Sequence, residues 1–284
     1  MSRPRRAGML VLAMVGAWGL LWLGGRAAPS PPGEAAASAW LASALEDLAR
    51  GRSESAIGKL RLARWNVPDD PEAPILLAWV HASRGEWDQA AELVASLPEE
   101  QMDPSSRLAA RGLLAMAYHA TGRLPMAARA YGAVLEQAPS AVVALEGLGE
   151  LALQAARDER RGALLSEAWP SSPAPASSDA WRAAAEAYLR DAIARAPDRI
   201  DLYVLLAGSL MESDRWDEAE TLLRRALRVD FQAARVHFAL GQIYEHRGDR
   251  QAAVSAYRRA LEADPSFTPA LLRLERLEPS RSER

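Results

Sequence analysis

The 284-residue chain has no cysteine, which excludes disulfide bonds, thiolate metal sites and a cysteine nucleophile. It also excludes the acylated cysteine that anchors bacterial lipoproteins. Lysine is almost absent, since Lys59 stands alone against 33 arginines, a bias typical of GC-rich bacterial genomes. Alternating β-branched stretches are rare, while Ala, Leu, Arg and Glu dominate. This composition is typical of helices, and we expect an all-α protein.

The N-terminal residues have the pattern of a targeting segment. Three arginines among the first six residues precede an uncharged run of 19 residues, Ala7–Gly25. A helix that spans a bilayer needs about 20 apolar residues, whereas a signal peptide needs an apolar core of only about 7–15. The length favours a transmembrane anchor over residues 1–25, and Arg26 and Pro29 disfavour cleavage beyond it. A cleaved signal peptide is the alternative. In both cases the arginines stay in the cytoplasm and the rest of the chain crosses the membrane.

Charge is distributed unevenly along the chain. The total is −3, but residues 1–36 hold four arginines and one glutamate, so the remainder carries a net −6. That sign makes the remainder a poor match for nucleic acid or for an anionic membrane surface. Within the first segment, residues 26–36 are rich in proline and predict a short, stiff linker.

Residues 234–267 carry the pattern that organises the rest of the chain. Small, aromatic and turn-forming residues recur there at helical spacing: Leu240, Gly241, Tyr244, Gly248, Ala253, Tyr257, Ala260 and Pro265. Gly248 would close a first helix and Pro265 would end a second one. Small residues at 241 and 253 would let the two helices approach closely, so a bulky residue there would overpack the contact.

This pattern resembles the tetratricopeptide repeat (TPR), a 34-residue helix–turn–helix unit, except that His237 replaces the usual first tryptophan. The landmarks recur in phase along the chain. They predict repeats at 37–70, 71–104, 108–141, 142–199, 200–233 and 234–267, a cap helix at 268–277 and a charged tail at 278–284. An insertion at 157–180 interrupts the fourth repeat, and we expect a partly disordered loop there. The resemblance implies an α-solenoid of about six repeats over residues 37–277, following the N-terminal transmembrane helix.

The resemblance also implies a binding groove, because the first helix of each TPR commonly meets a peptide. Carried over to this chain, the N-terminal half presents apolar positions and one histidine: Leu41, Leu45, Ile75, Trp79, Met116 and His119. The C-terminal half presents mainly acidic positions: Glu146, Glu150, Asp201, Glu212, Arg235, Gln242 and Glu245. Packing in the core is the structural alternative for the first set, and a solvated face is the alternative for the second. The functional interpretation is a partner segment that is apolar at one end and basic at the other.

Motifs for chemistry are missing from the sequence. The four histidines are not spaced as zinc ligands, and there is no P-loop and no Gly-x-Ser-x-Gly. We therefore expect no catalytic, cofactor-binding or metal-binding residues, no enzyme activity and no nucleic-acid partner.

The sequence favours a protein-interaction scaffold at the bacterial cell envelope. A single N-terminal helix would hold it in the inner membrane, with the repeats in the periplasm. One alternative is a soluble periplasmic or secreted adaptor, released by signal cleavage. Another is an accessory subunit of an envelope enzyme or assembly complex. Homo-oligomerisation through the apolar N-terminal half is also open.

Overall fold

The computed structural model describes residues 32–171 and 173–278, and these residues form helices with no strand among them. The all-α class is thereby confirmed. The helices belong to two compact units. The N-terminal unit runs to Pro139 and includes Glu167–Ser172, and the C-terminal unit holds Ser140–Ser166 and the residues from Pro173 onward. The segment Glu167–Ser172 therefore belongs to one unit while both of its flanks belong to the other.

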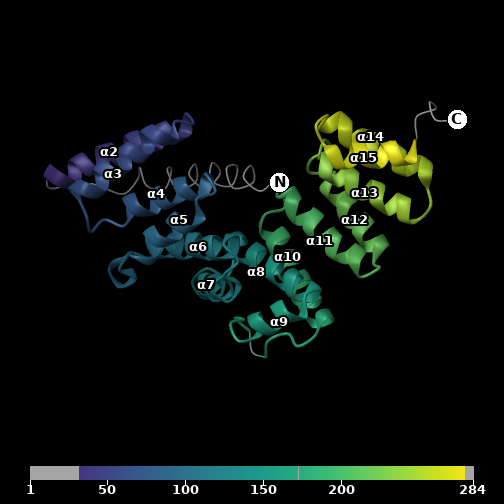
Figure 1. The fold of residues 1–284 in the computed structure, drawn as a ribbon, viewed down its shortest axis with the longest axis horizontal. Coiled ribbons are helices and arrows are strands. Elements are labelled where there is room, and N and C mark those ends of the chain that lie inside the picture. Colours follow the sequence, from purple (N-terminus) through teal and green to yellow (C-terminus); the bar gives the residue numbers. More distant parts are fainter. Residues whose placement is uncertain (1–31, 172, 279–284) are drawn as a thin grey trace. The chain divides into compact units, whose positions relative to one another are not determined.

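The N-terminal unit is a series of paired helices. Its elements are α2 (Pro32–Ala49), α3 (Ser53–Asn66), α4 (Glu72–Ser83), α5 (Trp87–Ala95), the short 3-10 helix η1 (Glu99–Gln101), α6 (Pro104–Ala120) and α7 (Leu124–Gln137). The partners are α2 with α3, α4 with α5, and α6 with α7, and each pair also packs on the next (Figure 1). This is the helix–turn–helix arrangement that the sequence pattern predicts.

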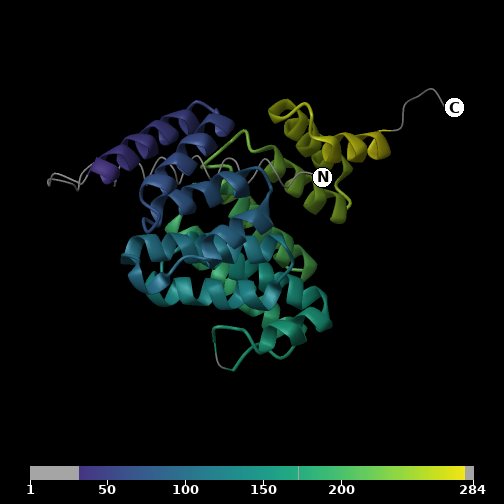
Figure 2. The same cartoon turned by 60° about the vertical axis from the view of Figure 1, so that its left-hand side comes forward.

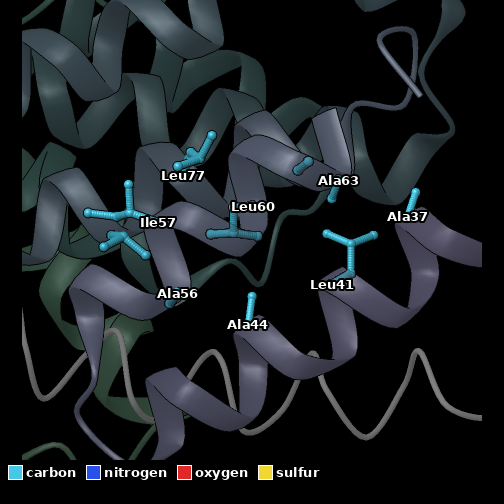
Figure 3. Packing of buried hydrophobic residues seen from close by; sticks show 10 residues of the cluster. Ala37, Leu41, Ala44, Ala56, Ile57, Leu60, Ala63 and Leu77 are labelled. Atoms are coloured by element: carbon cyan, nitrogen blue, oxygen red, sulfur yellow. The ribbon is translucent and has the colours of Figure 1, made fainter. Parts of the chain in front are cut away.

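The α2–α3 pair shows how the small residues position the helices. Ala37, Leu41 and Ala44 of α2 are buried against a stripe of α3 that contains Ala56, Leu60 and Ala63. Figure 3 shows Ala37 and Leu41 at the Ala63 end of this cluster and Ala44 at the Ala56 end, so the two helices are antiparallel. Alanine at the contact lets the helices pack at close range, which large side chains would prevent.

The C-terminal unit continues the pairing. Its helices are α8 (Val142–Arg157), α9 (Glu159–Ser166), α10 (Ser178–Arg195), α11 (Ile200–Glu212), α12 (Trp216–Ala226), α13 (Ala234–His246), α14 (Arg250–Ala263) and α15 (Thr268–Leu277). The pairs are α8 with α10, α11 with α12, and α13 with α14. The last helix, α15, packs on α14, and Figure 2 shows the two together in yellow at the end of the unit.

The tight turns inside these pairs need a left-handed backbone, which glycine adopts without strain. The residues at this position are Gly51, Gly85, Gly122 and Gly248, with φ of 72°, 80°, 76° and 75°. The turn between α11 and α12 uses Asp214 instead, at φ 60°. Aspartate tolerates this conformation better than most side chains, which explains how the pattern survives there without glycine.

The insertion differs from the partly disordered loop that the sequence predicts for 157–180. Residues Glu159–Ser166 form the helix α9, which packs on α8 and buries Leu165 completely. Farther along, Trp169 is only 7% exposed. The burial of one leucine and one tryptophan, both within a polar segment, explains why the segment is ordered. Helix α10 then resumes at Ser178, capped by the Ser177 hydroxyl, which accepts from the Ala180 N–H.

Two helix starts also lie earlier than the sequence pattern places them. Helix α2 begins at Pro32, inside the linker predicted for 26–36, because proline is well tolerated in a first turn and good helix formers follow it. Helix α6 begins at Pro104, so residues 105–107 are its first turn and not a spacer before the repeat at 108–141. Asp103 caps α6 by accepting from the Ser105 N–H at 2.9 Å.

The structure describes only part of each chain end. The predicted anchor, residues 1–25, lies outside the described residues, and no helix within 32–171 and 173–278 is long and apolar enough to cross a bilayer. At the other end, residues 279–284 of the predicted tail also lie outside. Glu278 is described, and its carboxylate lies 2.9 Å from the Arg258 guanidinium.

Candidate functional site

The apolar positions predicted for the groove divide into core and surface. Leu41 and Ile75 are 2% and 3% exposed and pack inside the core clusters of the N-terminal unit. They are therefore positioned to hold helices together. Leu45, one turn after Leu41 on α2, is half-buried.

Trp79 and Met116 form the most prominent pair among the predicted positions. Trp79 lies on α4 and Met116 on α6, two helices that pack against each other, and both side chains cover the same core cluster while staying partly exposed. His119, one turn after Met116, is also half-buried, with its ring edge-on to Tyr131 at a centroid distance of 6.1 Å. Partly exposed aromatic and methionine side chains on neighbouring helices can accept an apolar partner side chain.

The acidic positions of the C-terminal unit meet arginines of the same unit. Arg199, just before α11, lies 2.9 Å from Glu146 on α8 and 2.6 Å from Asp201 on α11. This bridge fastens the start of α11 to α8. Burial raises the pKa of Glu146 to about 7, because desolvation outweighs the attraction of Arg199, and the charges of Asp201 and Glu150 act in the same direction as burial.

Two further acids are engaged in the same way. Arg157 at the end of α8 donates through two nitrogens to Glu212 at the end of α11, at 2.9 and 2.6 Å, which is the fork geometry of a bidentate pair. Glu245 on α13 accepts from the Tyr257 hydroxyl at 2.7 Å and from Arg273 at 3.0 Å. Glu150, Arg235 and Gln242 are half-buried on the same helices.

The arginines are the residues that sequence reasoning missed. Arg157, Arg199 and Arg273 are far from their carboxylate partners in sequence, and nothing in the repeat pattern marks them. Only a comparison of each acid with basic residues one repeat away could have indicated the pairing. Because these pairs neutralise much of the acidic set, the C-terminal unit offers less free negative charge than its sequence suggests.

The histidines take structural contacts. His81 lies 2.5 Å from Glu86 across a turn, His237 Nε2 lies 2.8 Å from the Phe231 carbonyl, and His246 stacks on Trp216 with ring centroids 3.7 Å apart. Among the described residues no three His, Asp or Glu side chains gather in a way that could hold a metal ion.

The fold and the site define a class of protein, the helical-repeat interaction proteins. The features that define it are paired helices with small residues at their contacts, glycine turns, and half-buried apolar side chains on neighbouring helices. Two family models, each described as tetratricopeptide repeat, match residues 47–116 and 204–266. The chain is therefore a tetratricopeptide repeat protein over these two ranges. No curated protein matched the chain.

Solved structures support the fold. The Cut9–Hcn1 assembly of the APC/C is similar over 97% of this chain, with a TM-score of 0.65 and 16% identity, although this chain spans only 46% of that one. The Pseudomonas aeruginosa protein pilF is similar over 87% of this chain and 100% of its own, with a TM-score of 0.63 and 17% identity. Human IFIT1, solved as a dimer with m7Gppp-AAAA, covers 86% of this chain and 54% of its own, with a TM-score of 0.59 and 17% identity. At such identities the likeness establishes the fold alone, and a shared fold does not carry a partner with it.

Proposed function

We propose that this protein is a binding scaffold of about six repeats that holds a partner protein along the first helices of its N-terminal unit. The observation that carries the proposal is the pair of Trp79 and Met116, which come from neighbouring helices and stay partly exposed over one core cluster. Tryptophan in such a position is a common anchor of protein recognition. TPR proteins are in general non-catalytic interaction modules, and we assign this chain no catalytic role.

The proposed partner segment is apolar where it meets Trp79 and Met116. The acids of the C-terminal unit are held by arginines at distances of 2.6–3.0 Å, so the proposal does not require a strongly basic segment there. What the C-terminal unit offers a partner is a set of fixed polar groups. Such groups favour specificity of hydrogen bonding over long-range attraction.

We propose further that the chain acts at the bacterial inner membrane, held by the apolar run Ala7–Gly25, with its repeats in the periplasm. The support is the length of that run and the arginines before it. Confining the repeats to the membrane would raise the effective concentration of partners in the same membrane.

Site-specific photo-crosslinking in intact cells tests the binding surface. A photoreactive residue at Met116, on α6, should capture a defined protein in good yield. The matched control is Met126 on α7, the second helix of the same pair, which is 46% exposed. The proposal predicts a crosslinked species at position 116 that is absent or at least several-fold weaker at position 126, and that disappears when Trp79 is replaced by alanine.

The outcomes separate the alternatives. Equal crosslinking at both positions, or none at either, contradicts binding along the first helices. Because the chain has no cysteine, a single Met126→Cys also reports placement. Labelling by a membrane-impermeant maleimide in spheroplasts, with the protein in the membrane fraction, is expected. Labelling of a shorter, soluble form would instead identify the adaptor released by cleavage.

A further inference from the structure

The exposed face of α3 is an apolar surface without an assigned role. Trp65 is 85% exposed and Leu62 is 45% exposed, and the two lie three residues apart on one face of the helix. Tryptophan is a highly buried residue type on average, so a fully presented one indicates a partner. The other face of α3 is already used, since Ala56, Leu60 and Ala63 pack on α2.

The register of the α2–α3 pair fixes where this face lies along the hairpin. Lys59 donates to the Ser43 carbonyl, and the Ser55 hydroxyl donates to Asp47, so each step forward along α3 matches a step back along α2. Continuing this register places Trp65 opposite Ala37, near the start of α2. Figure 3 agrees, because Ala63 lies at the Ala37 end of the cluster.

The start of α2 is close in sequence to the apolar run. Residues 26–31 separate Gly25 from α2, and even a fully extended chain of that length reaches only about 20 Å. If the run Ala7–Gly25 lies in a bilayer, the end of the hairpin that carries Trp65 is held within reach of the lipid headgroups.

The charges at this end fit that position. Arg61 and Arg64 lie four residues and one residue before Trp65 on α3, both are exposed, and neither forms a salt bridge within the described part of the chain. Asp69 in the loop that follows is exposed and opposes them. With Asp70, the next residue of the loop, the two arginines and two aspartates at this end cancel, in contrast to the net −6 of the chain beyond residue 36. Tryptophan is enriched at membrane–water interfaces, and an arginine guanidinium can bind a lipid phosphate.

We propose that the end of α3 formed by Arg61, Leu62, Arg64 and Trp65 rests on the bilayer surface and fixes the first helix pair against the membrane. This inference rests on the proposed anchor. The partner is lipid: Trp65 and Leu62 enter the headgroup region and the two arginines meet phosphate groups. The first helix pair then contacts the membrane, and the surface around Trp79 and Met116 is held at a defined distance from it.

The test uses the full chain reconstituted in vesicles. Asn66→Cys keeps Trp65 and gives a single labelling site beside it, and a polarity-sensitive fluorophore is attached there. The matched control is the same label at Met126→Cys, an exposed site in the same unit. Quenchers attached to lipid acyl chains should dim the label at position 66 at least threefold more than the label at 126, and aqueous iodide should do the reverse.

A charged substitution and a change of lipid sharpen the result. Leu62→Glu with Trp65→Glu should abolish the difference between the two labels while the protein still floats with the vesicles. Replacing zwitterionic vesicles by vesicles with anionic lipid should shift the equilibrium between the free and lipid-contacting states by less than the about fivefold expected for one net positive charge, because Asp69 and Asp70 offset the two arginines.

Other outcomes overturn the inference in distinguishable ways. If the protein does not float with vesicles, both the proposed anchor and the proposed contact of α3 with lipid are wrong. If the protein floats but iodide quenches the label at position 66, only the proposed contact of α3 with lipid is wrong. A label that becomes shielded in detergent as protein concentration rises assigns the face to a second copy of the chain. Shielding in native membranes but not in pure vesicles assigns it to a protein partner.

Discussion

Gly241 on α13 shows how strictly one position can determine the packing of a helix pair. A Cβ atom there would lie well inside the contact distance of the Tyr257 ring on α14. Tyr257 cannot move aside cheaply, because its side chain is fully buried and its hydroxyl donates to Glu245 at 2.7 Å. The close approach that the sequence predicts at this position is therefore confirmed.

Gly241→Ala should lower the free energy of unfolding by about 1–3 kcal/mol, the usual cost of overpacking. The matched control is Gly208→Ala on α11, where an added Cβ would meet nothing within 4 Å. That variant should gain up to about 1 kcal/mol, because alanine is the better helix former. Urea unfolding of both variants checks the pair, and a Gly241→Ala protein as stable as the wild type would contradict the packing argument.

Asp47 is the strongest buried charge of the first helix pair. It is 2% exposed and lies 2.6 Å from the ammonium group of Lys59 and 2.5 Å from Arg52. The hydrogen bond from Lys59, followed by that from Ser55, lowers the pKa of Asp47 from 3.8 to about 2. Such a group stabilises the folded state fully above about pH 4 and loses this contribution as pH falls toward 2.

The wild-type chain should therefore lose stability between about pH 4 and pH 2 more steeply than Asp47→Asn, when both are unfolded with urea across this range. At neutral pH the variant should be the less stable of the two, because Lys59 and Arg52 lose their partner. Ser55→Ala should reduce the acid slope only in part. Parallel curves for wild type and Asp47→Asn would show that this carboxylate does not contribute.

At the scale of elements, the arginine bridges decide how successive first helices are joined. The pKa of Glu146 is raised, so the folded state binds a proton at a higher pH than the unfolded state does. The contribution of this residue to stability therefore falls as pH rises from about 4.5 to about 7. Above that range the carboxylate is charged in both states and its contribution is constant.

Glu146→Gln should remove this decline, since the amide keeps a hydrogen bond to Arg199 and does not titrate. Urea unfolding of wild type and variant at intervals from pH 4.5 to pH 8 measures this pH dependence of the free energy of unfolding. The two proteins should converge at the acid end, and the variant should be the more stable one at pH 8. A variant that is less stable at pH 8 would mean that attraction to Arg199 outweighs burial.

Helix α9 gives an element that the repeat pattern does not contain. Leu165 is fully buried and its neighbour Leu164 is 60% exposed, so the two provide a matched pair. Leu165→Ala should cost about 2–5 kcal/mol of stability, whereas Leu164→Ala should change it by less than about 0.5 kcal/mol. Thermal or urea unfolding distinguishes them. Equally small stability changes in the two variants would instead support the partly disordered loop that the sequence predicts for this segment.

The sequence predicted most helices because the repeat has a period, and Gly51, Gly85, Gly122 and Gly248 mark it. It could not predict α9, which lies outside that period and is held by the burial of Leu165. It placed Trp79 and Met116 on neighbouring helices, as the structure has them. The pairing of Glu212 with Arg157 depends on a contact across 55 residues, which no local pattern encodes.

At the scale of the whole molecule, the chain passes between the two units three times. Pro170, in the segment Glu167–Ser172, packs against Gly132 of α7, where an added Cβ would lie 2.8 Å from the proline. This segment is covalently continuous with α9 and α10 of the other unit. The peptide bond between Pro139 and Ser140 is therefore only one of the three connections between the units.

A protease site inserted between Pro139 and Ser140 should leave the two fragments together after cleavage, as a single species in size-exclusion chromatography. Gly132→Val should weaken this association by crowding the position of Pro170, and Gly208→Ala is the neutral control in the other fragment. Fragments that separate at once after cleavage in the otherwise unmodified protein would show that the segment contributes little.

The pairing of Lys59 with Asp47 also has a chemical consequence. Because the chain has a single lysine, an acylating reagent finds one side-chain amine, which belongs to a side chain that is 24% exposed and is engaged in a salt bridge. Its reaction rate reports how often the first helix pair opens. The acylation rate of Lys59 in cells would therefore show whether the first helix pair stays closed there, without an engineered label.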